Sequence, residues 1–183
     1  MIEPTDKIGN ITLYNADCME VMKQFKDKEF DLAIVDPPYG IGFGKFNRTN
    51  KTGNGERVKA NKYKNSDWDS AIPDKEYFEE LLRVSENQIV WGGNYFPYLW
   101  HNGCKCFIFW YKGNPVPNFA DGELAWTSFK QGLKIFDYAR GNDSGFAPKL
   151  KGQERIGINI HPTQKPIKLY EWIIANYAKP NDK

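Results

Sequence analysis

The sequence predicts an α/β fold with an open sheet, and three observations carry that prediction. The chain opens with a short strand at 11–14, a helix that starts near Asp17 and an apolar, β-branched strand at 30–35. A right-handed crossover of this kind makes the two strands parallel. Apolar residues then recur at helical spacing over 73–85, and an apolar strand follows at 88–91. Strands that alternate with helices in this way indicate layers of helix packed on a sheet.

Composition bounds the class of protein. At 183 residues the chain fits one domain with a sizeable core, and its 40% hydrophobic and 26% charged content is ordinary for a globular protein. A net charge of +2 is too small to identify a polyanionic partner by itself. No apolar run approaches transmembrane length, and the N-terminus is not that of a signal peptide. The three cysteines are an odd number, which argues against a disulfide framework and favours a reducing cytoplasm.

A metal site is one interpretation of His101, Cys104 and Cys106, which lie close together in the sequence. However, Cys106 opens an apolar run, and no second ligand pair has the spacing of a zinc site. We therefore expect buried or edge thiols and no metal.

The first helix begins where Asp17 and Glu20 have the spacing of a capping box. Val21, Met22 and Phe25 would give this helix its apolar face. Two roles stay open for Asp17: its carboxylate caps the helix, or it also lines the sheet edge as a ligand contact.

The stretch Asp36-Pro37-Pro38-Tyr39 follows the strand at 30–35 and carries the strongest functional signal. A residue before proline is extended, and each proline fixes φ and lacks an N–H donor. The result is a rigid rim with a carboxylate, bare carbonyl oxygens and an aromatic ring. Ligands of open α/β sheets bind outside the carboxyl ends of the strands. The alternative is a strand that simply ends in a Pro-Pro turn with a surface tyrosine.

This rim suits a planar ring that bears an exocyclic amine, such as adenine or cytosine. A carboxylate and a carbonyl that accept both N–H bonds would localise the lone pair of the amine nitrogen. Tyr39 could stack on the base, and a sulfonium methyl held in line would complete the reaction through positioning and electrostatics.

Two segments have the composition of a nucleic-acid contact. Residues 41–70 form a long, glycine-punctuated, basic segment that we expect to be a mobile loop above the rim. Residues 139–159 are polar, glycine-punctuated and basic, and they belong to a short region, 129–159, that resembles one for target recognition. A solvated charged loop without a partner is the alternative. The candidate phosphate contacts are Lys45, Arg48, Lys51, Arg57, Lys59, Arg140, Lys149 and Lys151.

Further elements complete the expected sheet. Gly92-Gly93 follow the strand at 88–91 and allow either a tight turn or the close approach of a ligand. A core strand is expected at 106–111, and segments 123–129 and 134–138 look like two strands paired with each other.

The C-terminal segment begins with His161-Pro162-Thr163-Gln164-Lys165-Pro166 and continues as a helix to about Tyr177. Pro166 suits the first turn of a helix. The preceding loop would present Thr163, Gln164 and Lys165 at a helix N-terminus, where a carboxylate ligand binds well. A polar loop before a helix is the plainer interpretation of this stretch alone.

Three of these stretches together resemble one family, the β-class amino-methyltransferases of DNA. They are Tyr14-Asn15-Ala16-Asp17-Cys18, Asp36-Pro37-Pro38-Tyr39 and His161-Pro162-Thr163-Gln164-Lys165-Pro166. Their order and co-occurrence are far more specific than any one motif.

The resemblance implies a Rossmann-like sheet in a three-layer α/β/α arrangement, permuted so that the catalytic half comes first. It implies methyl transfer from S-adenosylmethionine to a base flipped out of duplex DNA. Asp at the first position of the tetrapeptide favours adenine N6, and cytosine N4 stays an alternative. The implied catalytic residues are Asp36, Pro37, Pro38 and Tyr39. The implied cofactor contacts are Asp17, Cys18, Asp36, His161, Thr163, Gln164 and Lys165.

In the family, a segment like Ala178-Lys179-Pro180-Asn181-Asp182 leads into a strand and a glycine loop that cradles the cofactor, whereas this sequence stops at Lys183. The expectation is therefore one catalytic domain over 1–183 whose cofactor half is largely absent, with a cofactor-bordering loop and helix at 160–179. A homodimer or a complementing chain would restore it. Alternatives are a non-catalytic DNA-binding remnant, or a methyltransferase that acts on RNA or protein amides. A cytoplasmic protein of a bacterial or phage restriction–modification system is the expected setting.

Overall fold

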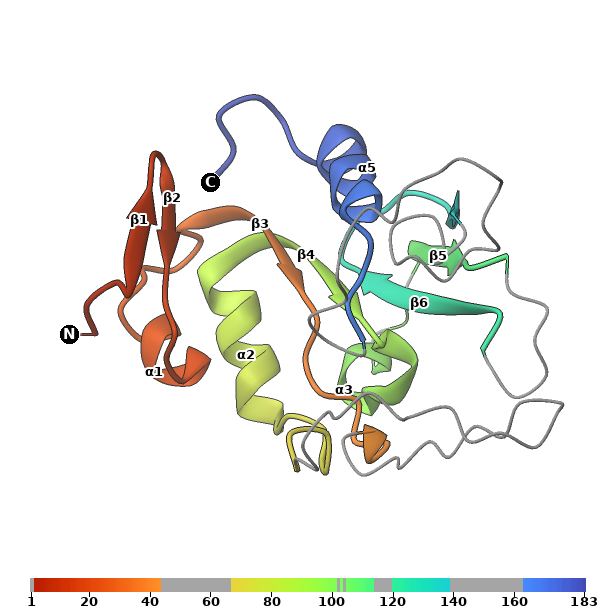
Figure 1. Cartoon of the computed structure of the whole chain (residues 1–183), viewed down its shortest axis with the longest axis horizontal. Helices are drawn as coiled ribbons and strands as arrows, with labels where there is room; N and C mark the ends of the chain where they lie inside the picture. The colour runs from red at the N-terminus through yellow and green to blue at the C-terminus, as the bar shows by residue number, and fades with distance from the viewer. Residues whose placement is uncertain (1, 44–66, 102, 104, 114–119, 139–162) are drawn as a thin grey trace, which may run out of the picture.

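A computed structural model describes residues 2–43, 67–101, 103, 105–113, 120–138 and 163–183. A five-stranded mixed sheet forms its centre, and a two-stranded hairpin lies apart from it (Figure 1). The strands are β1 (Asp6–Ile8), β2 (Ile11–Leu13), β3 (Phe30–Val35), β4 (Ser85–Trp91), β5 (Phe107–Tyr111), β6 (Gly122–Thr127) and β7 (Lys134–Asp137). The helices are α1 (Cys18–Met22), α2 (Lys75–Val84), the 3-10 turn η2 (Gly93–Tyr95), α3 (Pro97–Trp100) and α5 (Ile167–Tyr177).

The strand order in the sheet is β3-β4-β6-β5-β7. β3 runs parallel to β4, and β5 runs parallel to β7, whereas β6 is antiparallel to both of its neighbours. The predicted α/β class is confirmed as a mixed α/β fold. The crossover between β3 and β4 contains α2, as expected for a parallel pair.

Two predictions about strand pairing are wrong. β2 is not parallel to β3 but pairs antiparallel with β1, with Ile8 opposite Ile11. A two-residue link that contains Gly9 at φ +60° joins these strands, and such a short link makes a hairpin. Strands β6 and β7 do not pair with each other either. Both edges of β6 are already occupied by β4 and β5, so β7 adds to the other edge of β5.

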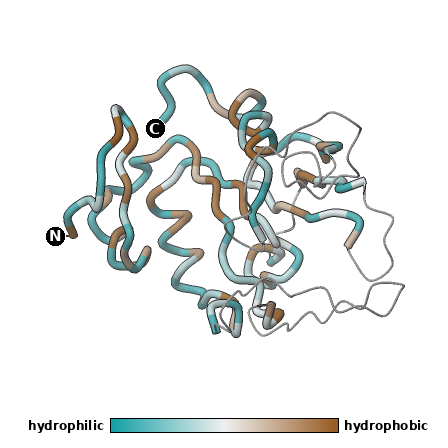
Figure 2. The backbone as a smooth tube through the Cα atoms, viewed as in Figure 1, coloured by the Kyte–Doolittle hydropathy of each residue, from teal (hydrophilic) through white to brown (hydrophobic). Residues whose placement is uncertain are grey.

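Helices cover both faces of the sheet, and alternate residues of β4 point to opposite sides (Figure 1). Ile89 and Trp91 pack in a core with Leu169 and Ile173 of α5. Val90 instead packs in a second core that α2 and α3 complete. Figure 2 shows the hydrophobic stretches along β3 and β4 that these two cores require.

The predicted helix at 73–85 is confirmed as α2, whose buried side chains are Phe78, Leu81 and Val84. The first helix is shorter than predicted. α1 spans only five residues, ends before Phe25 and buries Val21 alone.

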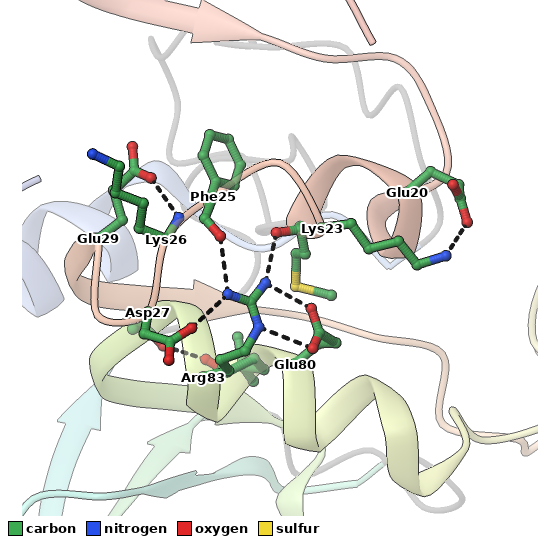
Figure 3. A network of polar contacts seen from close by, with 11 residues as sticks. Glu20, Lys23, Phe25, Lys26, Asp27, Glu29, Glu80 and Arg83 are labelled. Atoms are coloured by element: carbon green, nitrogen blue, oxygen red, sulfur yellow. Dashed lines mark hydrogen bonds and ion pairs between the residues drawn. The ribbon is translucent and has the colours of Figure 1, made fainter. Parts of the chain in front are cut away.

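Arg83, in the last turn of α2, fastens the segment that follows α1 (Figure 3). Its guanidinium donates to both carboxylate oxygens of Glu80 and to the carboxylate of Asp27. It also donates to the backbone carbonyl oxygens of Phe25 and Met22, at 2.9 and 3.0 Å. One planar, five-donor group therefore fixes α1 relative to α2.

Residue Lys183 lies against β3, the edge strand of the sheet. Its carbonyl oxygen accepts a hydrogen bond from the amide of Asp31 at 2.9 Å, and its own amide donates to the Asp31 carboxylate. Within the described ranges, no helix has the length and apolar character that crossing a membrane requires.

Candidate active site

Asp36-Pro37-Pro38-Tyr39 leaves the sheet directly after β3, as the sequence predicts. One oxygen of the Asp36 carboxylate, Oδ1, accepts a hydrogen bond from the Tyr39 hydroxyl at 2.7 Å. The other oxygen, Oδ2, accepts from the ammonium of Lys165 at 2.6 Å. The Lys165 ammonium also lies 3.0 Å from the Tyr39 hydroxyl oxygen. The fold thus brings a predicted cofactor contact onto the predicted catalytic carboxylate.

The Tyr39 hydroxyl acts as the hydrogen-bond donor in its contact with Asp36. Burial, followed by the negative charges of Glu123 and Asp36, raises the pKa of Tyr39 far above its ordinary value. The hydroxyl therefore keeps its proton and directs it at Asp36, which holds the carboxylate in one orientation.

A chain of alternating charges continues inward from Asp36. Lys165 lies 3.3 Å from Glu123 Oε2, and Lys112 lies 2.5 Å from Glu123 Oε1. Only 2% of the Lys165 side chain is exposed, so its charge depends on these partners. Burial by itself would raise the pKa of Glu123. The ammonium groups of Lys165 and Lys112 outweigh burial and hold that pKa below its ordinary value.

Sequence reasoning missed Glu123 and Lys112 as site residues. Glu123 was predicted to lie in a strand whose residues 123–127 loosely match the amino-methyltransferases, and that match was the available signal, but no site role was assigned to it. Lys112 follows directly after β5 and offered no separate signal.

Asp69 holds the turn that contains the tetrapeptide, and sequence reasoning missed it as well. Its carboxylate accepts hydrogen bonds from the backbone amides of Tyr39, Gly40 and Phe43, at 2.7, 2.9 and 2.8 Å. The amide of Gly42 donates to the Asp69 carbonyl oxygen. Asp69 is 2% exposed, and these donors satisfy its buried charge.

The segment 41–70, predicted as a mobile basic loop, is described only at its two ends. The Asp69 carboxylate joins the two ends of this segment through its hydrogen bonds to amides within residues 39–43. The middle of the segment, with Lys45, Arg48, Lys51, Arg57 and Lys59, lies outside the described residues. The same is true of His161 and of Arg140, Lys149 and Lys151.

The ring of Tyr39 stacks on the ring of Tyr95, with centroids 5.1 Å apart and an interplanar angle of 16°. Gly92 has φ +70°, and a Cβ atom there would lie 2.2 Å from Tyr39 Cε1. The tight turn predicted for this glycine pair is confirmed, whereas the close approach of a ligand stays a prediction. The ring that lies close to Gly92 belongs to the protein.

A pocket of about 760 Å³ adjoins Asp36 between α1, the end of β3 and the start of α2. It brings Cys18 together with Asp36, Pro37 and Pro38 of the predicted site. The lining residues are Cys18, Met19, Val35, Asp36, Pro37, Pro38, Pro73, Asp74, Glu76 and Tyr77.

Asp17 caps the helix at the mouth of this region, which confirms the first of its two roles. Its carboxylate accepts from the Met19 amide at 2.8 Å. Glu20 does not complete a capping box, because its carboxylate pairs with Lys23 at 2.5 Å. Burial and the charge of Asp17 raise the pKa of the Cys18 thiol, so the pocket wall is uncharged at that point.

The pocket fits a cationic ligand with apolar parts. Asp36, Asp74 and Glu76 supply negative charge, whereas Val35 and the prolines supply apolar walls. An ammonium or a sulfonium group is stabilised next to carboxylates. Thr163 and Gln164 precede α5 and do not line this pocket, and Lys165 reaches the site by bonding to Asp36.

The described ranges contain no cluster of three His, Cys, Asp or Glu side chains with metal-ligand geometry. Cys106 is buried, and its sulfur lies 3.6 Å from the carbonyl oxygen of Gly132. Cys104 lies outside the described residues.

Comparison with known proteins identifies relatives. No protein-family model matches the chain. It is 28% identical over 210 residues to the type II methyltransferase M.HinfI of Haemophilus influenzae, covering 93% of this chain and 56% of that protein. It is 25% identical over 223 residues to the type II methyltransferase M2.LlaDCHI of Lactococcus lactis subsp. cremoris, covering 100% of this chain and 78% of that protein. The chain is therefore a distant homologue of type II methyltransferases and spans little more than half the length of the first relative.

Proposed function

We propose that this protein methylates DNA, transferring a methyl group from S-adenosylmethionine to N6 of an adenine flipped out of the duplex. One observation carries the proposal. The Asp36 carboxylate, held by Tyr39 and Lys165 at the end of β3, borders a pocket whose acidic and apolar lining suits the cofactor. The distant homology to type II methyltransferases supports the same reaction class.

Asp36 acts on the target amine. Its carboxylate accepts one N–H bond of the amine, and the Pro37 carbonyl oxygen accepts the other. Two acceptors in fixed positions draw the nitrogen toward tetrahedral geometry and localise its lone pair. The Tyr39 hydroxyl keeps the carboxylate from rotating, so that this geometry exists before the base arrives.

The cofactor supplies an electrophilic methyl group on a sulfonium sulfur. We assign its binding to Cys18 and Asp36 in the pocket, with Asp17 beside them. Asp74 and Glu76 add negative charge that favours a cationic ligand. His161, Thr163 and Gln164 remain proposed contacts to the methionine end of the cofactor.

The flipped base enters beside the ring pair of Tyr39 and Tyr95, which offers an aromatic surface for stacking. Flipping costs a few kcal/mol, which stacking and edge contacts offset. Contacts to the DNA backbone are proposed for Lys45, Arg48, Lys51, Arg57, Lys59, Arg140, Lys149 and Lys151. Completion of the cofactor site by a second copy or another chain is part of the same proposal.

The decisive experiment combines methyl-labelled S-adenosylmethionine with unmethylated duplex DNA, followed by digestion to nucleosides and chromatography. We expect label in N6-methyladenine, and we expect Asp36→Ala to abolish it. Asp6→Ala, on the exposed hairpin, is the control that should change nothing. Full activity of Asp36→Ala would refute the role of that carboxylate.

Other outcomes separate the alternatives. Label in N4-methylcytosine would support methylation of a DNA base and refute adenine as that base. Binding of DNA without binding of the cofactor would indicate a non-catalytic protein. Preferential labelling of structured RNA in a competition would overturn DNA as the substrate.

A further inference from the structure

Lys165 lies between two carboxylates, and only one of them belongs to the proposed catalytic residues. Its ammonium is 2.6 Å from Asp36 Oδ2 and 3.3 Å from Glu123 Oε2. Glu123 Oε2 is buried and has no hydrogen-bond partner among the residues that the structure describes. The ion pair at 3.3 Å thus brings Lys165 close to Glu123 without the alignment of a hydrogen bond.

The position of this ammonium conflicts with the proposed reaction. Lys165 occupies Asp36 Oδ2, an oxygen that the incoming amine of the base could use. The amine nitrogen also gains positive charge as it takes up a methyl group. A second positive charge a few ångströms away raises the energy of that state, most strongly where water is excluded.

Glu123 offers the ammonium another partner. Lys112 binds Glu123 Oε1 at 2.5 Å, so the carboxylate is held with Oε2 toward Lys165. The Lys165 ammonium also lies 5.4 Å from the centre of the Trp91 ring and 5.6 Å from that of Tyr39. A small movement toward Glu123 would turn a 3.3 Å contact into a full hydrogen bond while these aromatic contacts persist.

We propose that Glu123 is a positioning residue that draws the Lys165 ammonium off Asp36 when the target amine binds. Without a base, Lys165 neutralises and orients Asp36. With the base in place, the ammonium pairs with Glu123, and Asp36 Oδ2 becomes available to the amine while Oδ1 keeps its hydrogen bond from Tyr39. This inference rests on the proposed function, because it assigns the role of Glu123 at that same site.

The test uses duplexes that carry the methylation site, as read by sequencing the methylated product. One duplex has adenine at the target position, and the other has purine, which lacks the exocyclic amine. The ratio of their dissociation constants, measured by fluorescence anisotropy with S-adenosylhomocysteine present, reports the bond between the amine and Asp36. Methyl transfer to the adenine duplex is measured in parallel, with kcat and KM determined separately.

For the wild-type protein we expect the adenine duplex to bind about tenfold more tightly than the purine duplex, as a hydrogen bond to a carboxylate would give. Glu123→Gln should reduce this preference to less than twofold and raise the KM for DNA, because the ammonium then stays on Asp36. The double variant Glu123→Gln/Lys165→Met should restore the preference, since no ammonium is left to compete. It removes one charge of each sign at nearly constant volume, so it tests the inference even if Lys165→Met alone fails to fold.

Glu171→Gln is the matched control, because Glu171 pairs with Lys168 on the exposed face of α5. It should leave the preference and the kinetics unchanged. An unchanged preference in Glu123→Gln would overturn the inference, as would a double variant that stays as impaired as Glu123→Gln. Either result, obtained with an active wild-type protein, would leave the proposed function intact. A wild-type protein without methyl transfer would refute the proposed function and this inference together.

Discussion

Gly92 and Tyr39 are packed so closely that no side chain fits between them: a Cβ atom on Gly92 would lie 2.2 Å from Tyr39 Cε1. Gly92 directly follows β4, and Tyr39 follows β3, so this contact sets the distance between the ends of two neighbouring strands. The ring that stacks on Tyr95 and donates to Asp36 depends on the absence of a side chain at Gly92.

Gly92→Ala should therefore displace Tyr39 and reduce methyl transfer. Alanine at positive φ costs about 1–2 kcal/mol, and forcing a methyl group into a filled space adds about 1–3 kcal/mol. Gly9→Ala is the matched control, because Gly9 also has positive φ but has no described atom near its Cβ position. Urea unfolding should show a larger loss for Gly92→Ala than for Gly9→Ala. Equal losses of unfolding free energy in the two variants would mean that the Tyr39 ring moves aside without cost.

Asp69→Ala should destabilise the turn that follows β3. The substitution leaves the part-buried amides of Tyr39, Gly40 and Phe43 without their acceptor. Since an unsatisfied buried group costs about 1–3 kcal/mol, we expect a loss of about 3 kcal/mol in the free energy of unfolding. Asp69→Asn keeps one acceptor oxygen and should lose less. If Asp69→Ala unfolded at the same urea concentration as the control Asp6→Ala, the clamp would contribute nothing.

The charge chain predicts a dependence of stability on pH. The pKa of Glu123 is lowered in the folded protein, so its ionised form adds stability above the ordinary carboxyl pKa of 4.5. This contribution is lost as the pH falls through the lowered pKa. Lys165, Lys112, Tyr39 and Tyr170 face Glu123, and of these only the two lysines are charged in this range.

Lys112→Met should raise the pKa of Glu123 and flatten this dependence. The measurement is the free energy of unfolding between about pH 5 and pH 3, the window in which a carboxyl of lowered pKa takes up its proton. Lys23→Met is the control, because Lys23 pairs with Glu20 on the exposed surface. If the free energy of unfolding of Lys112→Met changed with pH as steeply as that of the wild type, the assigned effect of Lys112 on Glu123 would be wrong.

Arg83→Met should lower the melting temperature and weaken binding of the cofactor. The arginine joins α2 to the segment after α1 (Figure 3), and residues of both helices line the pocket. Arg83→Lys should rescue only in part, since an ammonium cannot reproduce the planar fork. Calorimetric titration with S-adenosylhomocysteine measures the binding. If Arg83→Met bound S-adenosylhomocysteine with unchanged affinity, α1 and α2 would keep their relative positions without the arginine.

Local pattern predicted the parts of the fold that depend on neighbours in sequence. The strand at 30–35, the helix at 73–85 and the cap at Asp17 were found because burial, helical spacing and capping are short-range properties. The hairpin of β1 and β2 and the placement of β7 were missed. The hairpin follows from the short link at Gly9, a turn signal that the prediction for 11–14 did not use. The placement of β7 depends on which strand edges remain free, and a single-strand pattern does not contain that information.

The same reasoning applies to the site. The tetrapeptide was found because its residues are consecutive. Lys165 was predicted near the cofactor, but its bond to Asp36 spans 129 positions in the sequence. Asp69 and Glu123 were missed because their importance comes from backbone amides and lysines that only the folded chain brings to them.

The clamp made by Asp69 has a consequence for how this protein could diversify. Because one carboxylate closes residues 39–43 onto residue 69, the catalytic turn is anchored independently of the sequence between these ends. The entropy of closing a loop grows slowly, by about 0.6 kcal/mol for each doubling of length. Insertions, deletions or exchanges within 44–66 should therefore be tolerated by the chemistry. If the proposed function holds, evolution could change the basic segment to suit another DNA sequence and leave the Asp36 carboxylate in its place.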